Sequence, residues 1–174
     1  MGELFDKLAN YGNSGIYPFH MPGHKRQKTV DFNPYKIDIT EIEGFDNLHH
    51  AEGVLLEAQK KAEKLYGSEE SHFLINGSTA GILSAVSACA KKTVLIARNC
   101  HKAVYHAALI RNLDVYYVYP EIQEEFMLNG GINPADVERS LEEHPEIEAV
   151  VITSPTYDGI VSDVKRIAEI AHAH

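Results

Sequence analysis

The 174-residue chain has no hydrophobic run long enough to cross a membrane; apolar stretches such as TVLIA and AVVIT have the length of β-strands. Its first residues, MGELFDKLANYG, lack the basic start and apolar block of a secretory signal. Basic residues are also few, since 16 Lys and Arg stand against 25 Asp and Glu. The net charge of −9 argues against nucleic-acid binding. We therefore expect a cytoplasmic protein without membrane or nucleic-acid partners.

Several common site signatures are missing as well. The only cysteines, Cys89 and Cys100, do not form a CxxC pair, which fits reduced thiols rather than a metal or redox motif. Neither GxxxxGK[ST] nor GxGxxG occurs, and no serine lies in a GxSxG elbow. The ten histidines are scattered, and Pro22-Gly23 prevents a helical turn between His20 and His24. We expect no metal site.

What is present is an ordinary globular composition, 44% hydrophobic and 24% charged, over a length that usually forms one domain. A helix over 2–12 and an irregular arm up to about Asn47 precede a helix from Val54 that ends near Gly67. Strand and helix patterns then alternate, which predicts a mostly parallel sheet covered on both faces. The expected strands are 72–75, 93–97, 114–120 and 148–153, and the expected helices are 80–90, one after RNCHK, one opened by Asn133-Pro134, and 162–172.

The stretch FLINGSTAGILSA at 73–85 combines an apolar run, a turn of small polar residues and a helix of small residues. The first N–H groups of a helix have no intrahelical partners, and the helix dipole favours an anion there. Gly77 permits a close backbone approach, and Ser78 and Thr79 add hydroxyl donors. The turn can therefore bind a phosphate; the alternative is that a hydroxyl merely caps the helix.

Two further loops follow predicted strands. In RNCHK, His101 can lie over an aromatic ligand, or it can be a helix-start histidine that backbone groups satisfy. In SPTYDG, Ser154 and Thr156 are candidate ligand contacts, while Asp158-Gly159 fits ordinary turn chemistry. Because ligands bind at the carboxyl ends of parallel strands, we expect these loops and NGST to converge on one crevice.

Together with FHMPGHK at 19–25, these motifs resemble the Orn/Lys/Arg decarboxylases, pyridoxal-phosphate enzymes of the aspartate-aminotransferase fold (fold type I). The stretch DITEIEGFDNLHHAEGVLLEAQKKAEKLYG at 38–67 is similar to the family's lead-in to the cofactor domain, so the resemblance runs from about Tyr17 to His174. It implies a three-layer α/β/α large domain and decarboxylation of lysine, arginine or ornithine. It also implies a homodimer or a higher homo-oligomer.

The resemblance assigns roles residue by residue. It implies that His101 stacks on the pyridoxal ring and that a hydroxyl of SPTYDG lies beside the phenolic oxygen. The stretch PGHK becomes part of the substrate side. The implied cofactor contacts are Gly77, Ser78, Thr79, His101, Ser154 and Thr156, and the implied substrate-side residues are His20, His24 and Lys25.

No lysine of the chain lies in a stretch resembling the family's cofactor-bonding motif, and we do not assign that role to Lys102. We therefore expect an N-terminal portion of the enzyme, inactive by itself, with a helix and arm over 1–50 and part of the cofactor domain over 51–174. Two alternatives remain open from the sequence alone. One is another fold-type-I enzyme, an aminotransferase or a carbon–sulfur lyase, and the other is a non-catalytic binding or regulatory module.

Overall fold

The computed structural model describes residues 3–17 and 42–174 of the chain. The chain divides into two compact units, with the boundary between Ser71 and His72. Most of the predicted arm, including His20, His24 and Lys25, lies outside the described residues. Within the described ranges, no helix is both long and apolar enough to cross a membrane.

The first unit contains the two predicted helices and a short 3₁₀ turn between them. These elements are α1 (Glu3–Gly12), η2 (Leu48–His50) and α2 (Val54–Tyr66). Helix α2 ends where the sequence predicts, because Gly67 adopts a left-handed conformation (φ 68°) and its N–H donates to the Glu63 carbonyl. Glycine adopts this conformation without the steric cost that a side chain adds.

The start of α2 is held by a carboxylate from the preceding loop. One oxygen of Asp46 accepts the Glu52 N–H at 3.0 Å, and the other accepts those of Gly53 at 2.8 Å and Leu55 at 3.0 Å. These hydrogen bonds, chiefly the one from Glu52, hold the pKa of Asp46 well below its usual range. Asp46 thereby caps a helix whose own N-cap residue, Gly53, has no side chain to do so.

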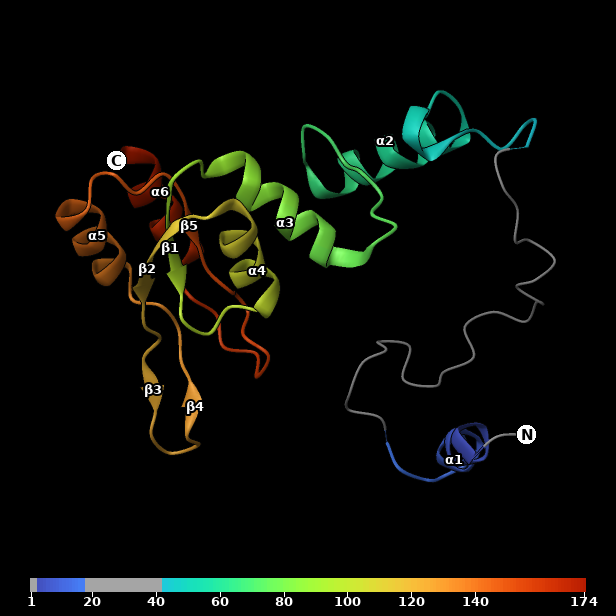
Figure 1. Cartoon of the computed structure of the whole chain (residues 1–174), viewed down its shortest axis with the longest axis horizontal. Helices are drawn as coiled ribbons and strands as arrows, with labels where there is room; N and C mark the ends of the chain where they lie inside the picture. Colours follow the sequence, from blue (N-terminus) through green and yellow to red (C-terminus); the bar gives the residue numbers. More distant parts are fainter. Residues whose placement is uncertain (1–2, 18–41) are drawn as a thin grey trace. The chain divides into compact units, whose positions relative to one another are not determined.

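The second unit is a sheet with helices on both faces (Figure 1). Its sheet has the order β2-β1-β5, and both pairs of neighbours are parallel, with Leu95 opposite both Tyr116 and Val150. Its elements are α3 (Gly77–Cys89), β1 (Thr93–Ala97), α4 (Lys102–Arg111), β2 (Asp114–Val118), β3 (Ile122–Gln123), β4 (Leu128–Asn129), α5 (Pro134–Glu143), β5 (Val150–Val151) and α6 (Val164–Ala173).

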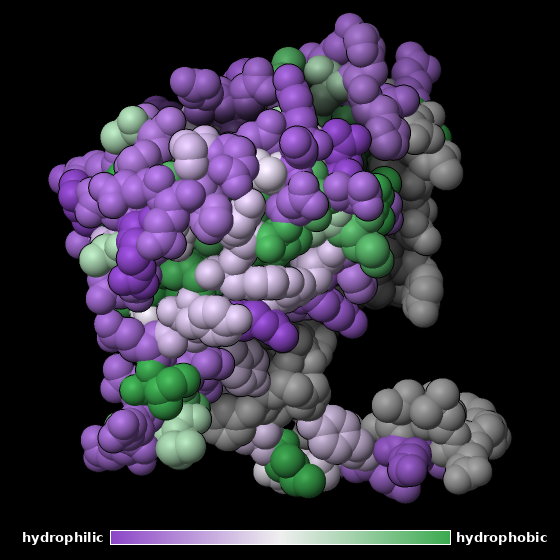
Figure 2. Space-filling view, turned by 60° about the vertical axis from the view of Figure 1, so that its left-hand side comes forward, coloured by the Kyte–Doolittle hydropathy of each residue, from purple (hydrophilic) through white to green (hydrophobic). Residues whose placement is uncertain are grey.

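Two hydrophobic clusters, one on each face, hold these layers together. Val94 and Ile96 of β1 pack with buried residues of α3 and α4, whereas Leu95 and Ala97 pack with buried residues of α5 and α6. Successive side chains of a strand point to opposite faces, so β1 contributes to both clusters. On the face shown in Figure 2, hydrophilic residues predominate and hydrophobic ones form small separate groups. The predicted three-layer α/β/α architecture with a parallel sheet is confirmed.

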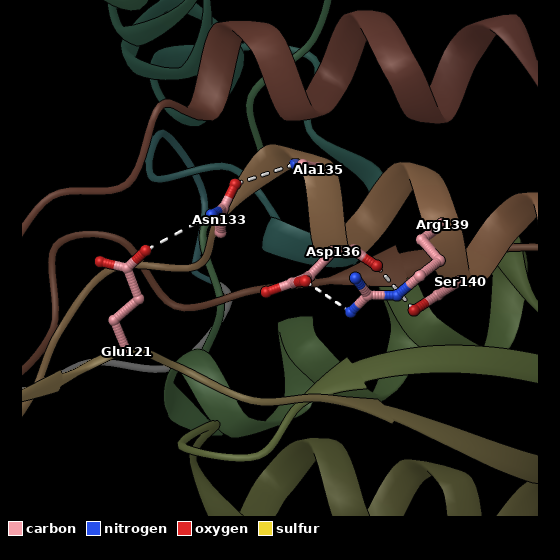
Figure 3. A network of polar contacts seen from close by, with 6 residues as sticks. All are labelled: Glu121, Asn133, Ala135, Asp136, Arg139 and Ser140. Atoms are coloured by element: carbon pink, nitrogen blue, oxygen red, sulfur yellow. Dashed lines mark hydrogen bonds and ion pairs between the residues drawn. The ribbon is translucent and has the colours of Figure 1, made fainter.

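Helix α5 begins at the predicted Asn133-Pro134 signal. The Asn133 side-chain oxygen accepts the Ala135 N–H at 3.0 Å, and its amide donates to Glu121 at 3.4 Å. Figure 3 shows this cap together with the Arg139–Asp136 ion pair at 2.5 Å one turn further along. The proline at the first helical position needs no N–H partner there, so it favours a helix start at this point.

The strand predicted over 72–75 does not form, so this prediction is wrong. Phe73, Leu74 and Ile75 are exposed, and no strand of the described residues pairs with them. The Leu74 side chain instead occupies the space beside Gly81, where an added Cβ would lie 2.6 Å from Leu74 Cδ1. An apolar run becomes a strand only when a neighbour accepts its backbone hydrogen bonds.

Two other predictions need adjustment. The strand predicted over 148–153 is reduced to Val150–Val151, which pairs on one side only. Between β2 and α5 the chain adds a hairpin, β3–β4, that the sequence pattern did not indicate. Gly130, just after the hairpin, is required by close packing, because a Cβ there would lie 2.9 Å from the Glu121 carbonyl oxygen.

Candidate functional site

The predicted loops RNCHK and SPTYDG both leave carboxyl ends of neighbouring parallel strands, β1 and β5. A cavity of about 590 Å³ lies between them and α3. His101 and Ser154 both line it, as do Ile82 and Val86 of α3 and the β5 residues. Two of the predicted cofactor contacts, from separate loops, therefore share one cavity. Carboxyl ends of parallel strands are the usual place for ligands in such sheets.

The start of α3 is not capped by a side chain. Asn76 is the N-cap residue but makes no side-chain capping bond, and Gly77 adopts φ 68° with open space where a Cβ would stand. Ser78 and Thr79 are exposed, and no hydrogen bond of their hydroxyls to other described residues is seen. The structure thus does not support simple hydroxyl capping, and the first N–H groups of α3 keep their capacity to bind an anion.

In the sequence, this helix start lies a few residues before the first residue that lines the cavity. Ile82 lines the cavity and comes three residues after Thr79, which corresponds to a rise of roughly 4.5 Å along an α-helix. Helix α3 ends just before β1 begins, so its N-terminus lies toward the carboxyl end of that strand. Gly77, Ser78 and Thr79 themselves do not line the cavity. Unlike the other two loops, NGST does not follow a strand.

His101 is the N-cap residue of α4, and its Nδ1 accepts the Ala103 N–H at 3.2 Å. One of the two arrangements considered from the sequence, a helix-start histidine hydrogen-bonded to the backbone, is therefore present, and it involves Nδ1 alone. Because Nδ1 accepts, the neutral ring carries its proton on Nε2. The side chain is exposed and lines the cavity. Capping fixes the ring while leaving its face and the Nε2 donor available to a ligand.

Cys100 joins the two loops, a role that nothing in the sequence pattern indicated. Its thiol donates to the Val151 carbonyl at 3.5 Å, and the Thr153 hydroxyl donates to Sγ at 3.6 Å. Burial raises the pKa of this thiol. Cys100 positions the loop that carries His101 against the exit of β5.

Asn99, one residue earlier, was also missed. Its Oδ1 is buried and has no hydrogen-bond partner in the described part of the chain. A buried acceptor without a donor costs about 1–3 kcal/mol, so such atoms usually have a partner. Among the described residues, this oxygen therefore lacks the donor that buried acceptors usually have.

The hydroxyls of the SPTYDG loop serve the loop itself. Ser154 Oγ accepts the Ser162 N–H at 3.1 Å, and Thr156 Oγ1 accepts the Ile160 N–H at 3.1 Å. Thr156 is buried and does not line the cavity, whereas Ser154 does. Each hydroxyl still has its own proton to donate. Their predicted contact with a cofactor stays a prediction, with Ser154 the better placed.

Comparisons with known proteins agree with this picture. Residues 3–174 match the family described as Orn/Lys/Arg decarboxylase, major domain. The chain is 36% identical to the Bacillus subtilis protein YaaO over 97% of this chain and 37% of that one. It is 31% identical to an arginine decarboxylase of Bacillus cereus, over 98% and 39%. The inducible lysine decarboxylase of Escherichia coli K12 is 29% identical over 98% and 28%.

Among solved structures, the constitutive lysine decarboxylase of Escherichia coli matches 98% of this chain and 27% of its own, with a TM-score of 0.63 and 25% identity. The chain therefore spans less than two fifths of the length of these relatives. The match covers both described ranges, including the α3 start, the RNCHK loop and the SPTYDG loop. The chain belongs to the Orn/Lys/Arg decarboxylase family, in the part that forms its major domain.

Proposed function

We propose that this chain forms the phosphate-binding and ring-binding part of a pyridoxal-phosphate enzyme that decarboxylates lysine, arginine or ornithine. Family membership supports the reaction class. The observation that carries the proposal for this chain is structural. An uncapped, glycine-started helix lies one turn from a cavity that His101 and Ser154 line.

The residues present fit pyridoxal phosphate. Its dianionic phosphate suits the first N–H groups of α3 together with the Ser78 and Thr79 hydroxyls. Its flat ring suits the 590 Å³ cavity, most of whose lining is apolar.

When bound, the cofactor supplies an electron sink for the pair left at the substrate α-carbon as carbon dioxide departs. The chain's own residues bind and orient. The α3 N-terminus holds the phosphate, and His101, fixed by its Nδ1 bond, supports the ring and offers Nε2–H. Ser154 can donate its hydroxyl proton into the cavity. The predicted roles of His20, His24 and Lys25 on the substrate side remain part of the proposal.

No lysine of the described residues lines the cavity, and Lys102 lies exposed in the first turn of α4. We therefore expect no turnover from this chain by itself and assign no covalent attachment of the cofactor to it. The net charge of −9 favours encounter with a cationic amino acid. By family resemblance we also propose a homo-oligomer.

A binding titration tests the proposal. Pyridoxal phosphate is titrated into the chain, with pyridoxal, which lacks the phosphate, as matched ligand. Ser78→Asp places a negative charge at the start of α3, whereas Ser84→Asp places the same charge six residues later at an exposed position. We expect Ser78→Asp to weaken binding of the phosphate ester roughly tenfold or more, and Ser84→Asp to leave it nearly unchanged.

The proposal fails if pyridoxal binds as tightly as its phosphate, or if both variants behave alike. Borohydride reduction with peptide mapping gives an independent check. We expect no single lysine of this chain to be modified specifically. One specifically modified lysine would contradict our assigning no covalent attachment of the cofactor to this chain.

A further inference from the structure

Ser162, just after the SPTYDG loop, carries a buried hydroxyl that the site described above does not use. Its exposed fraction is 6%, and its Oγ accepts the Ile132 N–H at 2.9 Å. The Ser162 N–H donates in turn to Ser154 Oγ at 3.1 Å. Ser162 therefore connects the residue before the Asn133 cap of α5 to a residue that lines the 590 Å³ cavity.

The backbone of Ser162 is held between the starts of two helices. Its hydroxyl bonds to the chain that enters α5, and its carbonyl accepts the Val164 N–H at 2.8 Å as the chain enters α6. Packing is close here, because a Cβ at Gly131 would lie 3.4 Å from Ser162 Oγ. Asp163 then caps α6 by accepting the Arg166 N–H at 3.0 Å. Helices that pack on one cluster thus set the place of the Ser162 N–H, and such elements hold a group more precisely than a loop does.

This contact leaves the Ser154 hydroxyl able to donate to a ligand in the cavity. A hydroxyl has one hydrogen to donate and two lone pairs that accept. The Ser162 N–H occupies one lone pair, and no acceptor for the Ser154 hydrogen is seen in the described part of the chain. Thr153, the other hydroxyl residue that lines the cavity, instead donates to Cys100. Ser154 is thus the hydroxyl of the cavity lining whose hydrogen is available.

His101 is prepared in the same way. Its Nδ1 accepts the Ala103 N–H at 3.2 Å, which leaves Nε2–H as the donor. In both residues a backbone N–H takes an acceptor position of the side chain, and the remaining polar hydrogen is left for a ligand. Two donors in a mostly apolar cavity suit a flat ring that carries an acceptor oxygen.

We propose that Ser162 is a positioning residue of this cavity, which holds Ser154 so that its hydroxyl donates to an oxygen on the ligand ring. For pyridoxal phosphate, whose binding is the proposed function on which this inference rests, that oxygen is the phenolic one. A donor at this place favours the ionised oxygen over the neutral hydroxyl. Ser162 itself does not line the cavity and acts through Ser154.

A pair of ligands tests this role. Pyridoxine phosphate keeps the phosphate and the phenolic oxygen but has no aldehyde to react with lysines, and its deoxy analogue lacks the phenolic oxygen. We expect the original chain to bind pyridoxine phosphate roughly threefold to tenfold more tightly than the analogue, because the analogue loses one hydrogen bond. Ser154→Ala should abolish this preference, and Ser162→Ala should reduce it to roughly twofold or less. A general loosening of the fold would weaken both ligands alike and leave the preference unchanged.

Two further measurements identify the route. Ser162→Ala should weaken binding of pyridoxine phosphate in the original chain but not in the Ser154→Ala chain, since coupled residues do not act additively. Ser140→Ala is the matched control, because Ser140 Oγ donates to the Asp136 carbonyl at 2.7 Å and does not line the cavity. It should leave the preference intact. Where Ser162→Ala does not fold, Ser162→Cys takes its place, because sulfur is a weaker acceptor.

The outcomes separate this inference from the proposed function. If pyridoxine phosphate does not bind, both are overturned. If it binds and the original chain shows no preference over the analogue, only the positioning role is overturned. The same holds if Ser162→Ala keeps the full preference, as Ser140→Ala is expected to do.

Discussion

Strands β1 and β5 come from equally apolar stretches, TVLIA and AVVIT, yet they differ in the folded chain. All five residues of β1 are buried, and β1 pairs on both sides. β5 is two residues long, half-buried, and paired on one side. The difference shows that composition locates a strand, whereas its length and burial depend on neighbours that accept its hydrogen bonds and cover its faces.

The largest expected effect comes from truncating the same side chain in each strand region. Ile96→Ala removes a fully buried side chain of β1 and should lower the free energy of unfolding by about 2–5 kcal/mol. Ile152→Ala, just beyond β5 and half-buried, should cost clearly less. Urea denaturation followed by circular dichroism measures both. Equal losses would show that the two strand regions contribute alike to stability.

A smaller effect comes from the carboxylate that ties the start of β5 to that of β1. Glu148 accepts the N–H groups of Lys92 at 2.6 Å, Lys91 at 2.7 Å and Thr93 at 3.1 Å. These bonds, chiefly the one from Lys92, hold the pKa of Glu148 below its usual value. The folded state therefore gains stability from the ionised carboxylate, fully present above the unfolded pKa and lost as the pH falls through the folded pKa.

Glu148→Gln should accordingly lower stability at neutral pH, and its difference from the original chain should shrink below about pH 4. Denaturation midpoints between neutral and acidic pH measure this. Glu142→Gln, at an exposed position of α5, is the matched control and should show no such trend. A stability difference for Glu148→Gln that stays constant down to the lowest pH would show that the ionised carboxylate does not tie the two strands.

The smallest effect is a difference in thiol reactivity. Cys89, at the end of α3, is exposed, while Cys100 is partly buried, donates to the Val151 carbonyl and has a raised pKa. Iodoacetamide should modify Cys89 roughly tenfold faster or more, because the thiolate is the reacting form. Peptide mapping over time measures both rates. Equal rates would show that Cys100, in the loop between β1 and α4, is as accessible as Cys89.

Much of the fold follows from local signals. The cap at Gly67 is made by its own backbone N–H and the cap at Asn133-Pro134 by the Asn133 side chain and the proline ring, so both can be read locally. Strand 93–97 has helices before and after it in the chain. Whether the segment 72–75 forms a strand could not be predicted from local signals, because strand formation depends on a pairing partner that the local sequence does not encode. The β3–β4 hairpin, with the sequence EEFM between its strands, has no glycine turn signal to announce it.

Part of the candidate site could also be predicted, because its motifs are local features of the sequence. The motifs located the cavity loops, and His101 and Ser154 do share a cavity. Cys100 and Asn99 were missed. The hydrogen bond from the Cys100 thiol to β5 and the burial of the Asn99 amide oxygen can be recognised only in the folded structure. Thr156 is the opposite case. The motif made its hydroxyl a candidate cofactor contact, whereas in the structure that hydroxyl accepts a hydrogen bond from Ile160 of the same loop.

The proposed function requires that one small molecule spans the α3 start and His101. Nuclear magnetic resonance of the ¹⁵N-labelled chain tests this directly, by following backbone amide shifts during titration with pyridoxal phosphate. We predict that the amides of 77–79 and those around His101 shift together, with one common dissociation constant. Shifts confined to one of the two places, or two different dissociation constants, would contradict binding of a single molecule across both.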